Sequence, residues 1–115
     1  MKTTQFVVRT AALAALSMCG AVHAAEAYHQ DYLKWIYPLA NGNFVMAFAN
    51  SPASCTNVNS PKYFYVSVGA NGVTSDGAKG LLASALLAFA TGKKVTIVFE
   101  SSSSSCDVNR MIVSD

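Results

Sequence analysis

Residues 75–100 read SDGAKGLLASALLAFATGKKVTIVFE, which predicts a helix followed directly by a strand. Apolar residues recur from about Asp76 to Thr91 at the spacing of a broad buried stripe, at Ala78, Leu81, Leu82, Ala85, Leu86 and Phe89. We expect Ser75 to cap the start of this helix and Gly92 to end it in the left-handed conformation. Residues 94–100 then alternate, which directs Val95, Ile97 and Phe99 to the core.

Two strands joined by a hairpin are predicted near the start of the domain. Residues 25–32 are polar and lack clear periodicity, so we interpret them as a leader into the first strand, residues 34–39. Asn41-Gly42 favours a tight hairpin turn, because both residues tolerate positive φ. The partner strand is residues 44–49, with Phe44, Met46 and Phe48 on one face.

A loop rich in Ser, Asn and Pro, residues 50–61, leads to a third strand at residues 63–68. Its alternation places Phe64, Val66 and Val68 toward the core and Tyr63, Tyr65 and Ser67 on the opposite face.

After the helix and the fourth strand, the serine run 101–105 favours a flexible hairpin tip, since we find no base beside it. Residues 110–113 form the closing strand. The order of three strands, one helix and two strands is that of the OB-fold. The sequence therefore predicts a mainly β domain, a five-stranded OB-fold-like barrel with its helix between strands three and four.

Residues 1–24 have the order of a cleavable secretory signal: Lys2 and Arg9, an apolar run, and the small-residue ending Val22-His23-Ala24. The apolar run is about half of the roughly 20 residues that a membrane helix needs. An alternative is lipidation at Cys19, but the bulky Met18 before it disfavours this. We expect one exported domain, residues 25–115, that is periplasmic or secreted and has no membrane span.

Without the signal, the chain holds six basic and six acidic residues, so its net charge is zero. The formal +2 of the whole chain belongs to the signal. No basic field remains to attract phosphate backbones, which argues against nucleic-acid binding.

The exported part contains two cysteines, Cys55 and Cys106. Small domains outside the cytosol often add disulfides, and closing a loop of about 50 residues would contribute about 4 kcal/mol. A reactive thiol or a metal site is the alternative, but no C-x-x-C or histidine pair accompanies either cysteine. We therefore expect a structural bridge, with no metal or cofactor.

The chain resembles the small exported proteins related to the binding (B) subunits of subtilase cytotoxin and pertussis-like toxins, over about residues 35–114. The segments that carry this resemblance are Trp35-Ile36-Tyr37-Pro38, Tyr63-Phe64-Tyr65-Val66, residues 81–88 with 91–95, and residues 109–113 after Cys106. The resemblance implies a disulfide-bearing OB-fold and a non-enzymatic subunit, usually a pentamer, that recognises sialylated or other cell-surface glycans. It leaves open whether an A-subunit accompanies this chain.

The leading hypothesis is an exported binding module for a glycan or protein surface. Its candidate ligand-binding residues are Tyr63, Tyr65, Trp35 and Tyr37, because sugars are held by aromatic faces and neutral hydrogen-bonding groups. The alternative role of these rings is packing. For Trp35 and Tyr37 we expect packing to be the main role. For Tyr63 and Tyr65 packing and ligand binding are more evenly balanced.

Two other functions remain open. A periplasmic structural or interaction subunit is consistent with the low charge and high apolar content. A small hydrolase would need a nucleophile with a base, paired carboxylates or metal ligands. His29 stands alone in the leader, where we expect a solvated surface residue, and the acids are scattered, so we predict that the protein is not an enzyme.

Overall fold

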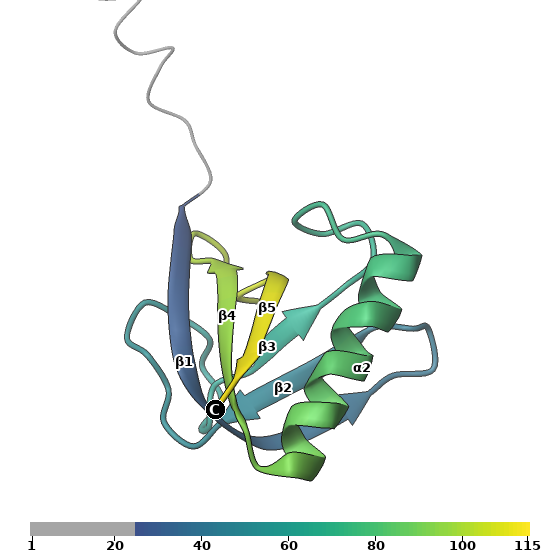
Figure 1. Ribbon diagram of the computed structural model, residues 1–115. Coiled ribbons are helices and arrows are strands. Elements are labelled where there is room, and N and C mark those ends of the chain that lie inside the picture. Colours follow the sequence, from purple (N-terminus) through teal and green to yellow (C-terminus); the bar gives the residue numbers. More distant parts are fainter. Residues whose placement is uncertain (1–24) are drawn as a thin grey trace, which may run out of the picture.

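The computed structural model describes residues 25–115. The elements in this range are β1 (Glu26–Pro38), β2 (Phe44–Phe48), β3 (Phe64–Val66), α2 (Ser75–Thr91), β4 (Lys94–Glu100) and β5 (Val108–Ser114). The predicted order of three strands, a helix and two strands is therefore confirmed (Figure 1). The predicted signal, residues 1–24, and the alternative of lipidation at Cys19 lie outside the described residues.

Strand β1 pairs with two different partners. Residues 26–32 pair antiparallel with β4, and residues 33–38 pair antiparallel with β2. The register shifts between Leu33 and Trp35, and such a bulge bends a strand and increases its twist. The prediction of a polar leader at residues 25–32 is wrong, because residues 26–32 belong to a strand in which exposed and half-buried side chains alternate.

The five strands form one antiparallel sheet in the order β3-β2-β1-β4-β5. Its two ends approach each other, since Tyr65 of β3 donates its backbone N–H to the carbonyl of Ser105, shortly before β5, at 3.2 Å. Figure 1 shows the curved β1 passing from one half of the sheet to the other, with α2 beside the strands. The predicted OB-fold-like barrel with a helix between strands three and four is confirmed.

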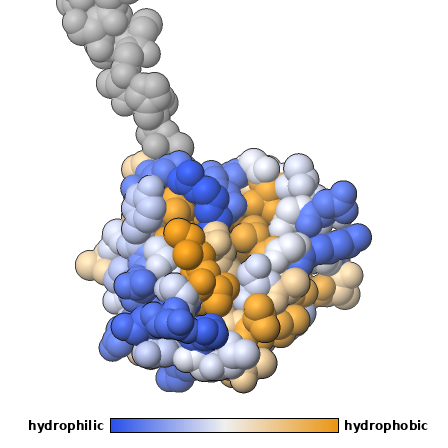
Figure 2. Space-filling view, viewed as in Figure 1, coloured by the Kyte–Doolittle hydropathy of each residue, from blue (hydrophilic) through white to orange (hydrophobic). Residues whose placement is uncertain are grey.

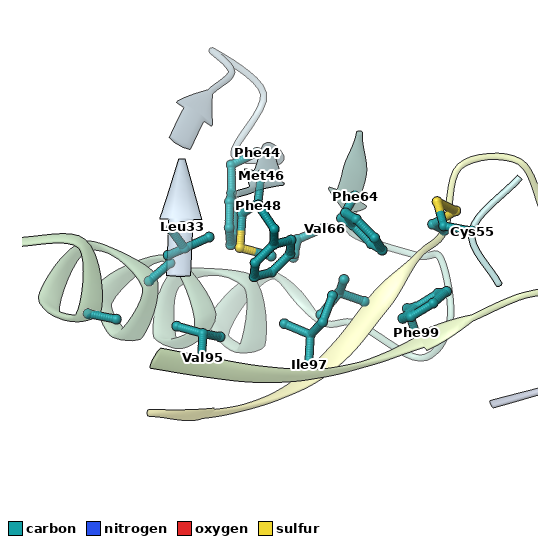
Figure 3. Packing of buried hydrophobic residues seen from close by; sticks show 14 of the residues in the cluster. Leu33, Phe44, Met46, Phe48, Cys55, Phe64, Val66, Val95, Ile97 and Phe99 are labelled. Carbon is teal, nitrogen blue, oxygen red and sulfur yellow. A yellow bond between two sulfur atoms is a disulfide. The ribbon is translucent and has the colours of Figure 1, made fainter. Parts of the chain in front are cut away.

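The core lies inside the curved sheet and beneath α2, and alternating residues of each strand supply it. Phe44, Met46 and Phe48 of β2 are completely buried, as predicted, and so are Val95, Ile97 and Phe99 of β4. In Figure 3 the rings of Phe48, Phe64 and Phe99 follow one another from the middle of this packing toward Cys55. Phe64 makes edge contacts with both other rings, with ring centres 5.2 Å and 5.1 Å apart.

Strand β3 is shorter than predicted. Phe64 and Val66 are buried, but Val68 lies beyond the end of β3 and is 44% exposed, so its predicted place in the core is wrong. The backbone N–H of Val68 donates to Asn43 Oδ1 instead of to a neighbouring strand. Side-chain alternation does not place Val68 inward, because the chain has already left the sheet.

Helix α2 ends at the predicted residue but begins with a different cap. Gly92 has the left-handed conformation, with φ at 67°, and its N–H donates to the carbonyl of Ala88. At the other end the cap is Thr74, whose hydroxyl accepts the N–H of Gly77 at 3.0 Å, and Ser75 is the first helical residue. The predicted Ser75 cap is therefore wrong by one residue.

The buried stripe of α2 is also narrower than predicted. Its fully buried members are Ala78, Ala85 and Ala88, flanked by the partly buried Leu81 and Leu82. Small side chains on the contact line let the helix backbone approach the strands, and larger residues stand beside that line. Leu86 and Phe89, expected inside, are 47% and 50% exposed.

The predicted disulfide is confirmed. Cys55 and Cys106 are bonded, with their Cα atoms 5.8 Å apart, and both are completely buried. The bridge joins the β2–β3 loop to the β4–β5 loop. In the described part of the chain, no helix is long and apolar enough to cross a membrane.

The cap assignment leads to a direct test. We expect Thr74→Ala to lower the free energy of unfolding by about 1 kcal/mol, because one helix N–H loses its acceptor. Ser75→Ala is the matched control, with a change of no more than about 0.5 kcal/mol. Urea unfolding followed by circular dichroism measures both. A larger loss for Ser75→Ala than for Thr74→Ala would contradict the assignment.

Candidate functional site

The structure brings the four predicted aromatic residues together on one face of the sheet. We call Trp35, Tyr37, Tyr63 and Tyr65 the aromatic patch. Tyr37 of β1 pairs with Val45 of β2, and Val45 pairs with Tyr65 of β3, so these residues form a row across three strands. Trp35 lies two residues before Tyr37 on β1, on the same face, and pairs with Ala47 of β2.

The rings of the aromatic patch contact one another. The ring centres of Trp35 and Tyr63 are 5.1 Å apart with their planes at 89°, and those of Trp35 and Tyr37 are 6.5 Å apart at 70°. Tyr63 and Tyr65 continue the series at 6.3 Å. A hollow of about 390 Å³ is lined by Trp35, Ile36, Tyr37, Pro38 and Tyr63.

The aromatic patch both packs and presents surface. Val45 and Ala47 alternate with the core residues of β2 and so belong to its outer face, yet they are 3% and 0% exposed. The rings that pair across from them lie on the same outer face, so part of each ring's role is packing. Tyr37 is nevertheless 54% exposed, while Trp35, Tyr63 and Tyr65 are half-buried. Packing therefore holds the rings without hiding them.

Two loops joined by the disulfide hold the backbone beneath Tyr63 and Tyr65. The amide oxygen of Asn57 accepts the N–H of Tyr63 at 3.1 Å, and its amide nitrogen donates to the carbonyl of Ser104 at 2.9 Å. The N–H of Tyr65 is held by Ser105. Asn57 was not predicted, because its partners lie 6 and 47 residues away and no local pattern relates them.

The serine run is more ordered by hydrogen bonds than a bare hairpin tip would be. Ser105 Oγ donates to Asp107 Oδ2 at 2.8 Å, and Ser102 Oγ donates to Glu100 Oε1 at 2.6 Å. The bond from Ser102 lowers the pKa of the half-buried Glu100. The expectation that no base stands beside these serines is wrong, since the run turns back onto carboxylates at both ends.

His29 is not the solvated residue that the sequence suggested. Its side chain is 14% exposed, and its ring stacks on Phe64 and meets the edge of Phe48. Its Nε2 lies 2.8 Å from the carbonyl of Asn50, to which it can donate, and 3.8 Å from Asp31 Oδ2. These contacts attach β1 to the loop after β2, which is a structural role.

Asp31 is the electrostatic centre of this attachment. Burial raises the pKa of its carboxyl, but the backbone N–H groups of Tyr32 and Asn50, the Asn50 amide and the nearby His29 together outweigh burial. The two backbone donors lie 2.7 Å from its oxygens. The net result is a pKa below the usual value for aspartate.

A second groove, not predicted, lies on the other half of the sheet. It has a volume of about 540 Å³ and is lined by Tyr28, Thr96, Val98, Arg110, Met111 and Ile112. Arg110 at this groove pairs with Glu26 at 2.7 Å. Tyr28 and Ile112 are 65% and 62% exposed, so this groove is an apolar surface with one engaged ion pair.

Comparison with known proteins identifies the fold. No protein-family model matches the sequence, and no curated protein matches it. Among solved structures, the chain is similar to the cholera toxin-like B-subunit from Citrobacter freundii. The TM-score is 0.55 at 13% sequence identity, over 85% of this chain and 92% of that chain. The protein thus shares the fold of this B-subunit. The narrower resemblance to the subtilase and pertussis-like subunits stays a prediction.

The lowered pKa of Asp31 sets a pH dependence of stability. Its carboxylate stabilises the fold above the pKa that it has when unfolded, about 3.9, and this contribution is lost as the pH falls through the folded value. We expect Asp31→Asn to lower the free energy of unfolding by about 2 kcal/mol at neutral pH and by much less near pH 2.

Urea unfolding at a series of pH values measures this dependence. Glu26→Gln is the control, with a change of no more than about 0.5 kcal/mol at any pH, because its pair with Arg110 is exposed to water. An equal loss for Asp31→Asn at neutral and acidic pH would mean that the charge of Asp31 does not stabilise the fold.

Proposed function

We propose that this protein is an exported, non-enzymatic binding module that recognises a glycan through the aromatic patch. The single observation that carries the proposal is the convergence of Trp35, Tyr37 and Tyr63 around one hollow on the outer face of the barrel. Aromatic rings fixed by packing offer flat apolar surfaces at little entropic cost, and pyranose rings present a matching face of C–H groups.

The toxin B-subunit fold supports a binding role in general. Export is supported by the disulfide, since such bridges persist in oxidising compartments. A glycan as the target and a pentameric assembly are what the predicted resemblance implies, and both are part of the proposal; an accompanying A-subunit is not. The protein would then act by attaching to a surface, not by chemistry on a substrate.

One observation favours the alternative of a structural or interaction subunit. Leu86, Leu87 and Phe89 of α2 are between 47% and 60% exposed. Figure 2 shows apolar residues, in orange, on the side of the molecule that carries α2. Contact between copies through this helix would be compatible with a free aromatic patch on the opposite face of the sheet. Oligomerisation and glycan binding are therefore not mutually exclusive.

A glycan array tests the proposal. We expect the mature protein to bind a set of related glycans, and Tyr37→Ala to reduce the signal at least about tenfold, because an exposed ring of the hollow is removed. Tyr28→Ala is the matched control, since Tyr28 is also an exposed tyrosine of β1 but lies at the second groove. We expect it to bind as the unmodified protein does.

Two results would contradict the proposal. The first is an array without any binding by protein shown to be folded and disulfide-bonded. The second is a loss of binding in Tyr28→Ala while Tyr37→Ala binds as the unmodified protein does. That result would place the site at the groove of Arg110 and Ile112.

A further inference from the structure

We infer that the aromatic patch selects an uncharged sugar, a neutral pyranoside, and gains nothing from sialic acid. The inference rests on the proposed function and specifies its ligand class. It differs from what the resemblance implies, since that includes sialylated glycans. Three observations support it: the absence of charge in the lining of the hollow, the hydrogen bonds of the nearest lysine and the arrangement of the rings.

No residue that lines the hollow is charged. The lining consists of Trp35, Ile36, Tyr37, Pro38 and Tyr63. A carboxylate that enters such a surface loses hydration and meets no cation in return, which is costly. A neutral sugar has no such penalty, because its hydroxyl groups remain at the open side of the hollow or bond to the phenols. Charge complementarity therefore favours an uncharged ligand.

The lysine next to the patch is already engaged. Lys62 directly precedes Tyr63, but its ammonium group donates to the carbonyls of Pro52 and Cys55, at 3.0 Å and 2.5 Å. These contacts turn the charge toward the disulfide loop, where it stabilises the backbone. Only one of the three N–H donors of this ammonium is left for a sialic acid carboxylate.

Lys34 is the other cation that adjoins the patch in sequence. It occupies the bulge before Trp35, and it is exposed and absent from the lining of the hollow. An exposed ammonium group in water adds little to binding and is screened by salt. It is the residue whose replacement distinguishes a neutral ligand from an acidic one.

The rings suit the shape of a sugar. Trp35 and Tyr63 stand nearly perpendicular and form a corner, so one ring can pack on the C–H face of a pyranose while the other meets its edge. Tyr63 and Tyr65 use their backbone N–H groups within the fold, and among the described residues their hydroxyls have no protein partner. The hollow, about 390 Å³, lies at the lower end of ligand pockets and fits one or two sugar rings.

The test compares lactose with sialyllactose by titration of the mature protein, followed through the fluorescence of its Trp35, the single tryptophan of the chain. We expect lactose to bind with a Kd that changes by no more than about twofold over an about tenfold rise in NaCl, because no ion pair forms. Sialyllactose should bind no more tightly than lactose. Lys34→Ala should leave both affinities unchanged, and Tyr37→Ala should abolish them.

Each outcome has a distinct meaning. Tighter binding of sialyllactose, with a Kd that rises with salt and a loss in Lys34→Ala, would overturn the inference while the proposed glycan recognition stands. Binding of neither these sugars nor any array glycan would overturn both. Proline-rich peptides also dock on aromatic grooves. Binding of such a peptide in place of every sugar would likewise overturn both and point to a protein partner.

Discussion

The double pairing of β1 is the constraint on which the rest of the structure depends. The first half of this 13-residue strand pairs with β4 and the second half pairs with β2. The bulge near Lys34 lies where the partner changes. Because the two halves face different neighbours, the sheet must curl, and the curl encloses the phenylalanine core. The same turn places Trp35 and Tyr37 on the outside of the barrel beside β2 and β3. The attachment of Asp31 and His29 to Asn50 holds this strand where it bends toward β2.

The disulfide fixes the two loops at the opening between the ends of the curled sheet. β3 is short and forms one end of the sheet, so pairing with β2 alone holds it weakly. The bridge from Cys55 to Cys106, together with the bonds of Asn57 to Tyr63 and Ser104, ties the loops on both sides of this opening. Tyr63 is thereby held against Trp35, and Tyr65 against Tyr63. A rigid, preformed aromatic surface loses little entropy on binding a ligand.

Local pattern predicted most of the fold and the membership of the aromatic patch, but not its surroundings. In β4 apolar residues alternate with Lys94, Thr96 and Glu100, and in β2 large side chains alternate with the smaller Val45 and Ala47, so the inward residues could be named. The first half of β1 was missed because the residues that face inward there include His29 and Asp31, whose burial is explained by partners distant in sequence. On α2 the predicted stripe missed the buried Ala88 and included the exposed Leu86 and Phe89, because hydrophobicity counts for the larger side chains and close packing favours the smaller one. The role of Asn57 depends on contacts between two loops, and the second groove depends on the register of β1, β4 and β5. No local spacing in the sequence encodes either of them.

The proposed binding face is the outer face of β1, β2 and β3. Mapping chemical shifts in an isotope-labelled sample of the mature protein during titration with lactose tests this assignment. We expect the signals of the Trp35 indole, of the Tyr37 and Tyr63 rings and of the Ile36 backbone to shift together and to saturate at one lactose concentration. Shifts confined to Tyr28, Arg110 and Ile112, or to the exposed residues of α2, would contradict it.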